Sequence, residues 1–550
     1  MAGVPKPLKS GRQKKEAQAA REPWPRLEKV IVVLIPIVAA SVRLIGITSD
    51  FPVLTDEAIY MRWAKIIEHQ NQWFIALLDG KQPLSYWLYA LLRFAGVDPL
   101  LGVRGLSAVA GGLTAILVYA IGKRVAGVAA GLVGALCWTV FPWSLVYDRL
   151  GLTEALVNLA GACIAYTTLL AFAGNRICWK NTALAATAVS LVFLLKATTL
   201  LFLFCPILLG LWLAPRPLGT LFQRWAVIFA AVPLVYLFLQ ATIPDAPVPE
   251  THSVVLHHTS RITSPAELAS DPFVNARKNF PLLSADLMHY FPLPAALLML
   301  GSFLYLAVNR SIAALIVICV SIVPIAVQVL VAPAFETRFA YPHTWPWMLV
   351  IGVGVQKCWG RWPHLSMSRA RLLGGAAMVL ITSVSMASLS LRILNDPQNE
   401  IESDDAGRQF GSYVHVAWGV PEAIDFLVSE AERQKGFVLL TDPFWGVPAD
   451  MAFAYLNERH GIRVHEAWWL QAGNASSTIV PRGEVEILKS HYERVSRGEM
   501  DFRKVPRVYY LTDTFYMPRL AVEARQPGAV LLKSFPKPEG NESVDVYRLK

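Results

Sequence analysis

Long apolar stretches recur along the first 390 residues and constrain the fold more than any other feature of the chain. They begin near Val30, end near Leu389, and approach the roughly 20 residues that a helix needs to cross a bilayer. Hydrophobic residues make up 54% of the 550 residues and charged residues only 16%, which is too apolar for an ordinary soluble protein. The sequence therefore predicts an α-helical, multi-pass membrane protein.

The apolar runs also predict a topology. We expect about eleven transmembrane helices, at residues 30–48, 101–121, 125–145, 152–173, 181–195, 197–214, 225–241, 293–308, 311–332, 341–356 and 372–390. Under this map, basic residues such as Lys123, Arg124 and Arg310 all occupy short connectors on one side. Short cytoplasmic loops are enriched in Lys and Arg, so we expect a cytoplasmic N-terminus and an extracytoplasmic C-terminus in the inner or plasma membrane of the cell.

The same map divides the chain into three parts. Residues 1–28 are basic and lack the apolar core of a signal peptide, so we interpret them as a cytoplasmic tail. Residues 29–391 form the membrane domain, with extracytoplasmic loops at 49–100 and 242–292. Residues 392–550 combine many charges with short alternating stretches, which predict an extracytoplasmic, soluble α/β domain.

Several elements outside the membrane are also predicted. Aromatic and aliphatic residues at helical spacing in 57–78 indicate an amphipathic helix in the plane of the interface, and a second helix is expected at 83–94. In the C-terminal domain we expect helices at 421–435 and 449–459, and strands at 437–440, 462–465, 508–511, 530–532 and 544–547.

Nothing in the sequence predicts a nucleic-acid partner, a cofactor or a metal site. The net charge of +10 lies largely in short loops and therefore indicates orientation in the lipid bilayer. His252, His257 and His258 could ligate a metal, but no carboxylate or thiol lies at ligand spacing from them. Dependence on a divalent metal stays open.

Charged residues stand where the map places the outer membrane boundary. A charge near hydrocarbon is costly and needs a purpose or a partner. These residues are Asp56, Glu57, Lys81, Arg149, Glu154, Lys196 and Arg338. Cations gathered there could neutralise a phosphate while a carboxylate accepts a proton, as transfer from a lipid-linked sugar phosphate requires.

The order of these motifs resembles the GT-C superfamily of glycosyltransferases. The nearest groups are the bacterial aminoarabinose transferases of lipid A and the protein O-mannosyltransferases, and the similarity covers about residues 30–390. The motifs are the Asp56 and Glu57 pair, Lys81-Gln82-Pro83-Leu84-Ser85-Tyr86-Trp87, Arg149 with Glu154, Lys196, and Arg338-Phe339-Ala340-Tyr341-Pro342. Those relatives often have His-Lys-Pro-Pro where this chain has Gly80-Lys81-Gln82-Pro83, which leaves the exact donor and acceptor open.

The resemblance implies a function and roles for the motif residues. The donor would be a polyprenyl-monophosphate sugar, the acceptor an extracytoplasmic lipid, glycan or protein, and the transfer would invert the anomeric centre. Asp56 would be the general base, with Glu57 and Glu154 as further catalytic candidates. The substrate-binding candidates are Lys81, Tyr86, Arg149, Lys196, Arg338 and Tyr341.

Other interpretations of these residues stay open. Asp56 and Glu57 could cap a helix, Glu154 could cap the fourth span, and Lys196 could only extend to the interface. A transporter or flippase of lipid-linked saccharides would also combine many spans with intramembrane charges. We favour an enzyme because the charges gather at one surface and the chain has no evident internal repeat. A sensor or assembly protein would not explain their shared boundary.

Overall fold

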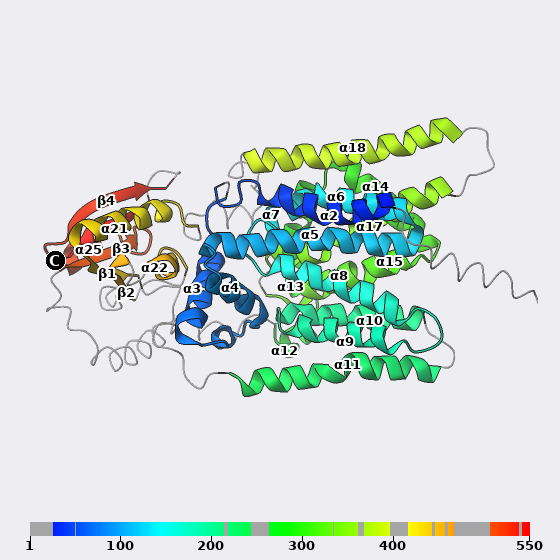
Figure 1. Ribbon diagram of the computed structural model, residues 1–550, viewed down its shortest axis with the longest axis horizontal. Coiled ribbons are helices and arrows are strands. Elements are labelled where there is room, and N and C mark those ends of the chain that lie inside the picture. Colours follow the sequence, from blue (N-terminus) through cyan, green and yellow to red (C-terminus); the bar gives the residue numbers. More distant parts are fainter. Residues whose placement is uncertain are drawn as a thin grey trace, which may run out of the picture.

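The computed structural model describes residues 26–49, 51–213, 218–243, 263–333, 335–360, 368–395, 416–442, 446–456, 460–466, 507–537 and 542–549. These residues form a bundle of helices with a small domain of strands and helices at one end (Figure 1). The predicted basic tail lies outside the described residues up to residue 25, as do the three loop histidines.

The bundle is built from helices that form near the predicted apolar runs. Its elements are α2 (Arg26–Leu44), α5 (Pro99–Ala126), α6 (Val128–Thr139), α7 (Pro142–Tyr147), α8 (Glu154–Ala171), α9 (Trp179–Phe193), η2 (Ala197–Leu203), α10 (Phe204–Trp212), α11 (Leu218–Ala241), α14 (Leu293–Val308), α15 (Ile312–Val317), η5 (Ile318–Ile322), α16 (Val323–Val331), α17 (Trp345–Gly360) and α18 (Ser368–Asn395). Among the described residues, five helices are long and apolar enough to cross a membrane. The total of about eleven spans stays a prediction.

Small residues bring the central helices α5, α6 and α17 together. A Cβ atom on Gly122 of α5 would lie 2.8 Å from the Cα of Gly131 in α6. A Cβ atom on Gly352 of α17 would lie 2.1 Å from the carbonyl oxygen of Ala130. These backbones could not approach so closely with larger side chains, which explains the glycines in otherwise apolar helices.

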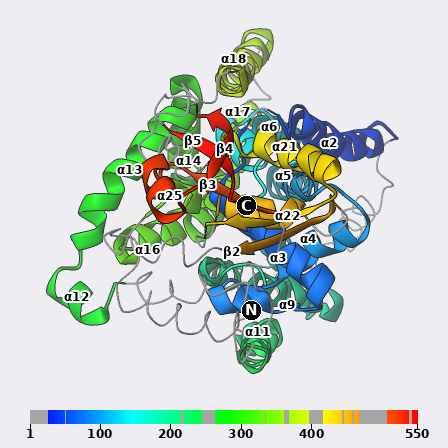
Figure 2. The same cartoon turned by 90° about the vertical axis from the view of Figure 1, so that its left-hand side faces the viewer.

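Shorter elements accompany the long helices of the bundle. They are α3 (Thr55–Gln70), η1 (Ile75–Asp79), α4 (Leu84–Phe94), α12 (Pro265–Ser270), α13 (Val274–Tyr290), η6 (Thr337–Phe339) and η7 (Tyr341–His343). Helix α3 runs across the bundle axis, between the bundle and the small domain (Figure 1). When the molecule is viewed along its long axis, α13 runs along one edge of the bundle, next to α12 (Figure 2). It meets α14 with a bend of 111°.

The helix predicted at 57–78 is shorter than expected and is covered. It ends at Gln70, because Asn71 adopts a left-handed backbone with a φ of 56°. Part of its polar surface is covered by the C-terminal domain, although His69 and Gln70 at its end are exposed. The Arg62 guanidinium pairs with Asp450 of the C-terminal domain at 2.6 Å, and both side chains are at most 5% exposed.

The C-terminal domain contains a mixed five-stranded sheet. Its elements are α21 (Val420–Gln434), β1 (Phe437–Thr441), α22 (Ala449–Tyr455), β2 (Ile462–Glu466), β3 (Val508–Asp513), α25 (Arg519–Arg525), β4 (Val530–Pro536) and β5 (Ser543–Arg548). The strand order is β2-β1-β3-β5-β4, with β1 parallel to β2 and β3, and β5 antiparallel to β3 and β4. Every predicted strand is present, whereas α25 was not expected.

The C-terminal domain docks directly on the segment that leads into α3. The backbone N–H of Ala417 donates a 2.8 Å hydrogen bond to the carbonyl of Val53, and Leu54 forms an antiparallel bridge with Val416. Further along α3, the ammonium group of Lys65 donates to the carbonyl of Leu456 at 2.7 Å. These contacts with the C-terminal domain therefore hold α3 and the segment before it in place.

Candidate active site

Asp56 is the second residue of α3 and lies at the end of the bundle next to the C-terminal domain (Figure 1). Its carboxylate pairs with the ammonium group of Lys81 at 3.5 Å and with the guanidinium of Arg338. Burial acts to raise the pKa of Asp56, but the charges of Lys81 and Arg338 outweigh burial and hold that pKa well below its usual range. Asp56 is therefore ionised at neutral pH, and its side chain keeps 14% of its surface exposed.

A second ion pair lies next to the first. Glu154, the first residue of α8, pairs with Lys196 at 2.5 Å, directly before η2 begins. The ring of Phe339 connects the two pairs, because Lys196 lies 4.8 Å and Arg338 5.3 Å from its centroid. The charge of Lys196 also contributes to the lowered pKa of Asp56. The two pairs thus form one electrostatic cluster.

Glu336 also belongs to this cluster, although it lies in none of the sequence motifs. Its carboxylate pairs with Arg338, and its side chain is 34% exposed. The carboxylates of the cluster are therefore Asp56, Glu154 and Glu336, and its cations are Lys81, Lys196 and Arg338. Its formal charges cancel, so an added phosphate must compete with a carboxylate for each cation. We name these six residues the charge cluster.

Aromatic rings support Lys81. Its ammonium group lies 5.2 Å from the ring centroid of Tyr60 and 5.3 Å from that of Trp63. Tyr86 packs edge-on against both rings, at 5.1 Å and 4.9 Å between centroids, and is almost fully buried. The structure therefore places Tyr86 against the two rings that lie next to Lys81.

Glu57 is Asp56's neighbour in sequence, but its carboxylate is fully buried and fully bonded. Arg104 donates from Nε to Oε1 at 2.7 Å and from Nη2 to Oε2 at 2.8 Å. The backbone N–H groups of Gly151 and Leu54 donate to Oε1 and Oε2 at 2.5 Å and 2.9 Å. A carboxylate has about four acceptor positions, so all of them are occupied. The bond to Leu54, just before α3, matches the helix-capping alternative for this residue.

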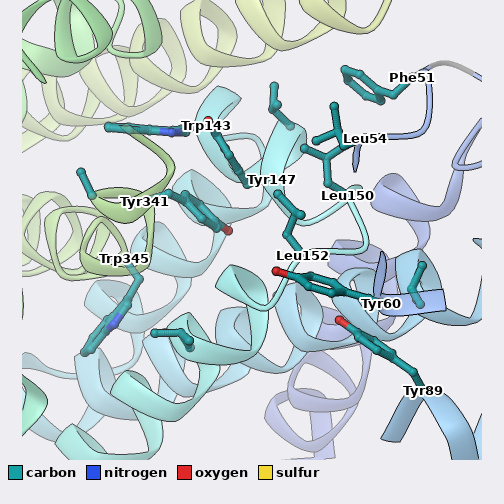
Figure 3. Packing of buried hydrophobic residues seen from close by; sticks show 14 of the residues in the cluster. Phe51, Leu54, Tyr60, Tyr89, Trp143, Tyr147, Leu150, Leu152, Tyr341 and Trp345 are labelled. Carbon is teal, nitrogen blue, oxygen red and sulfur yellow. The ribbon is translucent and has the colours of Figure 1, made fainter. Parts of the chain in front are cut away.

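Two further predicted residues have their described partners elsewhere. The buried Arg149 donates to the carbonyl of Ile45 and lies 5.4 Å from the ring centroid of Phe51. Tyr341 donates to Asp148, which pairs with Arg43 at 2.7 Å. Figure 3 shows Tyr341 beside Tyr147, with Leu152 between these two rings and the rings of Tyr60 and Tyr89.

The arginines of these structural networks, Arg43 and Arg104, were not selected from the sequence. Both are fully buried and both interrupt apolar runs. That interruption was a usable signal, because a cation inside a membrane helix needs a partner. Arg104 also donates to the carbonyls of Ile47, Phe51 and Pro52, and it thereby fixes the loop before α3.

Within the part of the chain that the structure describes, no group of three or more His, Cys, Asp or Glu residues could hold a metal ion. Each carboxylate of the charge cluster faces a cation. The cluster is therefore suited to binding an anion, because a phosphate can replace a carboxylate as the partner of a cation.

Comparisons with known proteins match this architecture. Residues 80–243 match the family model of the dolichyl-phosphate-mannose-protein mannosyltransferases. ArnT from Cupriavidus metallidurans bound to undecaprenyl phosphate aligns with a TM-score of 0.59 at 13% identity, over 94% of this chain and 98% of that one. Its apo structure aligns with a TM-score of 0.55 at 14% identity, over 95% and 98%.

A more distant match is an archaeal enzyme. The oligosaccharyltransferase AglB from Archaeoglobus fulgidus, in complex with an inhibitory peptide and a dolichol-phosphate, aligns with a TM-score of 0.51 at 12% identity, over 94% of this chain and 74% of that one. A comparison with curated protein sequences found no match. The structural matches confirm the predicted GT-C fold. The family match over residues 80–243 supports a glycosyltransferase.

Proposed function

We propose that this protein transfers a sugar from a polyprenyl-monophosphate donor to an extracytoplasmic acceptor, with inversion at the anomeric carbon. The observation that carries the proposal is the position of Asp56, an ionised and partly exposed carboxylate held between Lys81 and Arg338. ArnT and AglB, which share the fold, have been captured with undecaprenyl phosphate and a dolichol-phosphate. This supports a lipid phosphate as the group that the cations bind.

The cations have their largest effect in the transition state. As the bond between the anomeric carbon and the phosphate oxygen breaks, its electron pair passes to the leaving phosphate, which gains a second negative charge. Lys81, Lys196 and Arg338 can stabilise that charge at a site of low dielectric constant. The cations thereby favour the transition state more than the bound donor.

Asp56 acts on the acceptor in the same step. The acceptor oxygen forms its bond to the anomeric carbon from the face opposite the phosphate, and its proton passes to the Asp56 carboxylate. In the donor-free protein, Lys81 and Arg338 keep that carboxylate a weak base by lowering its pKa. A bound phosphate shares these cations, so donor binding raises the pKa of Asp56 and makes it a stronger base. Proton removal is thereby coupled to the presence of the donor.

The membrane orientation is part of the same proposal. The N-terminus is cytoplasmic, and the charge cluster and C-terminal domain face outward, because this orientation alone puts the short basic connectors inside. A cysteine introduced at Gly461, which is exposed, should react with a membrane-impermeant thiol reagent in intact cells. Reaction only after the cells are lysed would refute the orientation.

The function is tested by the products that the protein makes in cells. Mass spectrometry would compare extracytoplasmic glycolipids and glycoproteins from cells with the protein, without it, and with Asp56→Asn. We expect one class of molecules to carry an added sugar only with the wild-type chain. A flippase would instead change the distribution of a lipid-linked saccharide without forming a new glycosidic bond, and that result would overturn the proposal.

A further inference from the structure

A cavity of about 360 Å³ lies between the bundle and the C-terminal domain, away from the contacts of the charge cluster. One wall is the loop that leads into α3, including Phe51 and Val53. The other wall comes from the start of α21 and from α22, including Trp418 and Tyr455. Small-molecule sites often occur at such domain junctions and have volumes from about 300 to 1,000 Å³.

The lining of this cavity has a distinct chemistry. Its lining includes buried apolar side chains such as Phe51 and the partly exposed residues Trp418 and Tyr455. Glu422 and Asp425, which are three residues apart on α21 and exposed, also line the cavity. The described residues that line the cavity include no lysine, arginine or histidine.

We infer that this cavity binds a saccharide portion of the acceptor that carries no anionic group. Aromatic rings offer flat apolar faces to the C–H faces of a sugar, while the carboxylates accept hydrogen bonds from hydroxyl or ammonium groups. The donor phosphate is excluded, because Glu422 and Asp425 repel it and no cation of the lining would bind it. The phosphate and the acceptor saccharide therefore bind at sites of opposite charge.

The two sites are connected by a short, fixed segment. Val53 lines the cavity and Asp56 belongs to the charge cluster. Their Cα atoms can be at most roughly 11 Å apart, because consecutive Cα atoms are 3.8 Å apart. The hydrogen bond from Ala417 to Val53 and the bonds from Arg104 to Phe51 and Pro52 hold this segment in place. An acceptor in the cavity would therefore be held close to the general base. This inference rests on the proposed function only for the identification of its ligand as the acceptor.

The test measures saccharide binding in the absence of donor. Saturation-transfer NMR would be recorded on the full chain in lipid nanodiscs with chitotriose, its N-deacetylated form and trigalacturonate. We expect binding of the first two and none of the anionic sugar. Trp418→Ala should weaken binding at least ten-fold, and Glu422→Gln with Asp425→Asn should remove any preference for the amine form. Glu432→Gln, on an exposed part of α21 outside the cavity, is the matched control and should bind like the wild type.

Binding of undecaprenyl phosphate, measured in the same nanodiscs, shows whether each variant is folded and separates the two proposals. Absence of saturation transfer to all three sugars would overturn the inference, as would binding that Trp418→Ala leaves unchanged. Preference for trigalacturonate would also overturn it. If the trisaccharides bind but undecaprenyl phosphate does not, the proposed function fails while the saccharide site stands.

Discussion

Asp56 and Glu57 are consecutive carboxylates on one helix, yet the structure gives them opposite surroundings. Glu57 is fully buried, and all its acceptor positions are filled by Arg104 and two backbone N–H groups. Asp56 keeps part of its surface exposed and shares its partner Arg338 with Glu336. The difference shows that an acidic residue becomes a candidate base only where its partners can be exchanged for substrate groups.

The same contrast separates the two sets of cations. Arg43 and Arg104 are fully buried and bind carboxylates and carbonyls within the protein, so they hold loops and helices together. Lys81, Lys196 and Arg338 keep between 16% and 23% of their side-chain surface exposed. Only the second set can bind a ligand without dismantling the fold.

The largest expected effect is a loss of stability when the buried ion pair between Arg104 and Glu57 is broken. Arg104→Met would leave the Glu57 carboxylate buried without its counter-charge, and removing one partner of such a pair typically costs about 3–5 kcal/mol. We expect a large fall in folded yield and in thermal unfolding temperature, measured in detergent. Arg277→Met, which breaks an exposed pair with Asp271, is the control and should leave both unchanged. Normal stability of Arg104→Met would contradict the structural role of Glu57.

The second effect is on turnover, from removing cations of the charge cluster. Lys81→Met and Arg338→Met should each lower the rate of sugar transfer by roughly 10² to 10³, since each removes a charge that stabilises the leaving phosphate. Because Lys196→Met alone would strand the buried Glu154, it is tested together with Glu154→Gln. Lys123→Met is the control, because Lys123 lies in the last turn of α5 and pairs with Glu28, outside the charge cluster. Single-turnover rates at the level of the wild type in all three variants would refute the phosphate assignment.

The smallest effect is on pH dependence. In the donor-free protein the pKa of Asp56 is lowered, so protonation of this group should not limit kcat/KM between pH 5 and pH 8, above the ordinary aspartate pKa of about 3.9. Lys81→Met removes a positive charge that favours the carboxylate, so the pKa rises and the acid limb moves to higher pH. Lys123→Met should leave the limb in place. An acid limb that Lys81→Met does not move would argue against Asp56 as the titrating base.

The sequence predicted the helical bundle and most of the C-terminal elements because both have strong local patterns. Long apolar runs report membrane helices directly, and the strands at 437–440 and 508–511 are bounded by clear turns. The sequence did not predict that the C-terminal domain covers part of α3. Its partner Asp450 lies nearly 400 residues further along the chain, and no local pattern reports such a contact.

Most residues of the candidate site could be predicted from the sequence, but which of them lie together could not. The charges at the predicted boundary included Asp56, Lys81, Glu154, Lys196 and Arg338, which the structure brings into one cluster. The sequence could not separate them from Glu57, Arg149 and Tyr341, because burial and hydrogen-bond saturation depend on tertiary packing. Glu336 was missed because an exposed acid beside an arginine is ordinary in a loop.

The central claim is that Asp56, and not Glu57, accepts the proton of the acceptor. Single-turnover sugar transfer would be measured for Asp56→Asn and Glu57→Gln in nanodiscs saturated with a polyprenyl-phosphate sugar, with donor binding quantified in the same samples. We predict that Asp56→Asn binds donor but loses roughly 10² to 10⁴ in rate. Glu57→Gln should lose folded protein, while its folded, donor-bound fraction transfers within ten-fold of the wild type. Near wild-type transfer by Asp56→Asn, with a folded and donor-bound Glu57→Gln that is inactive, would contradict the account.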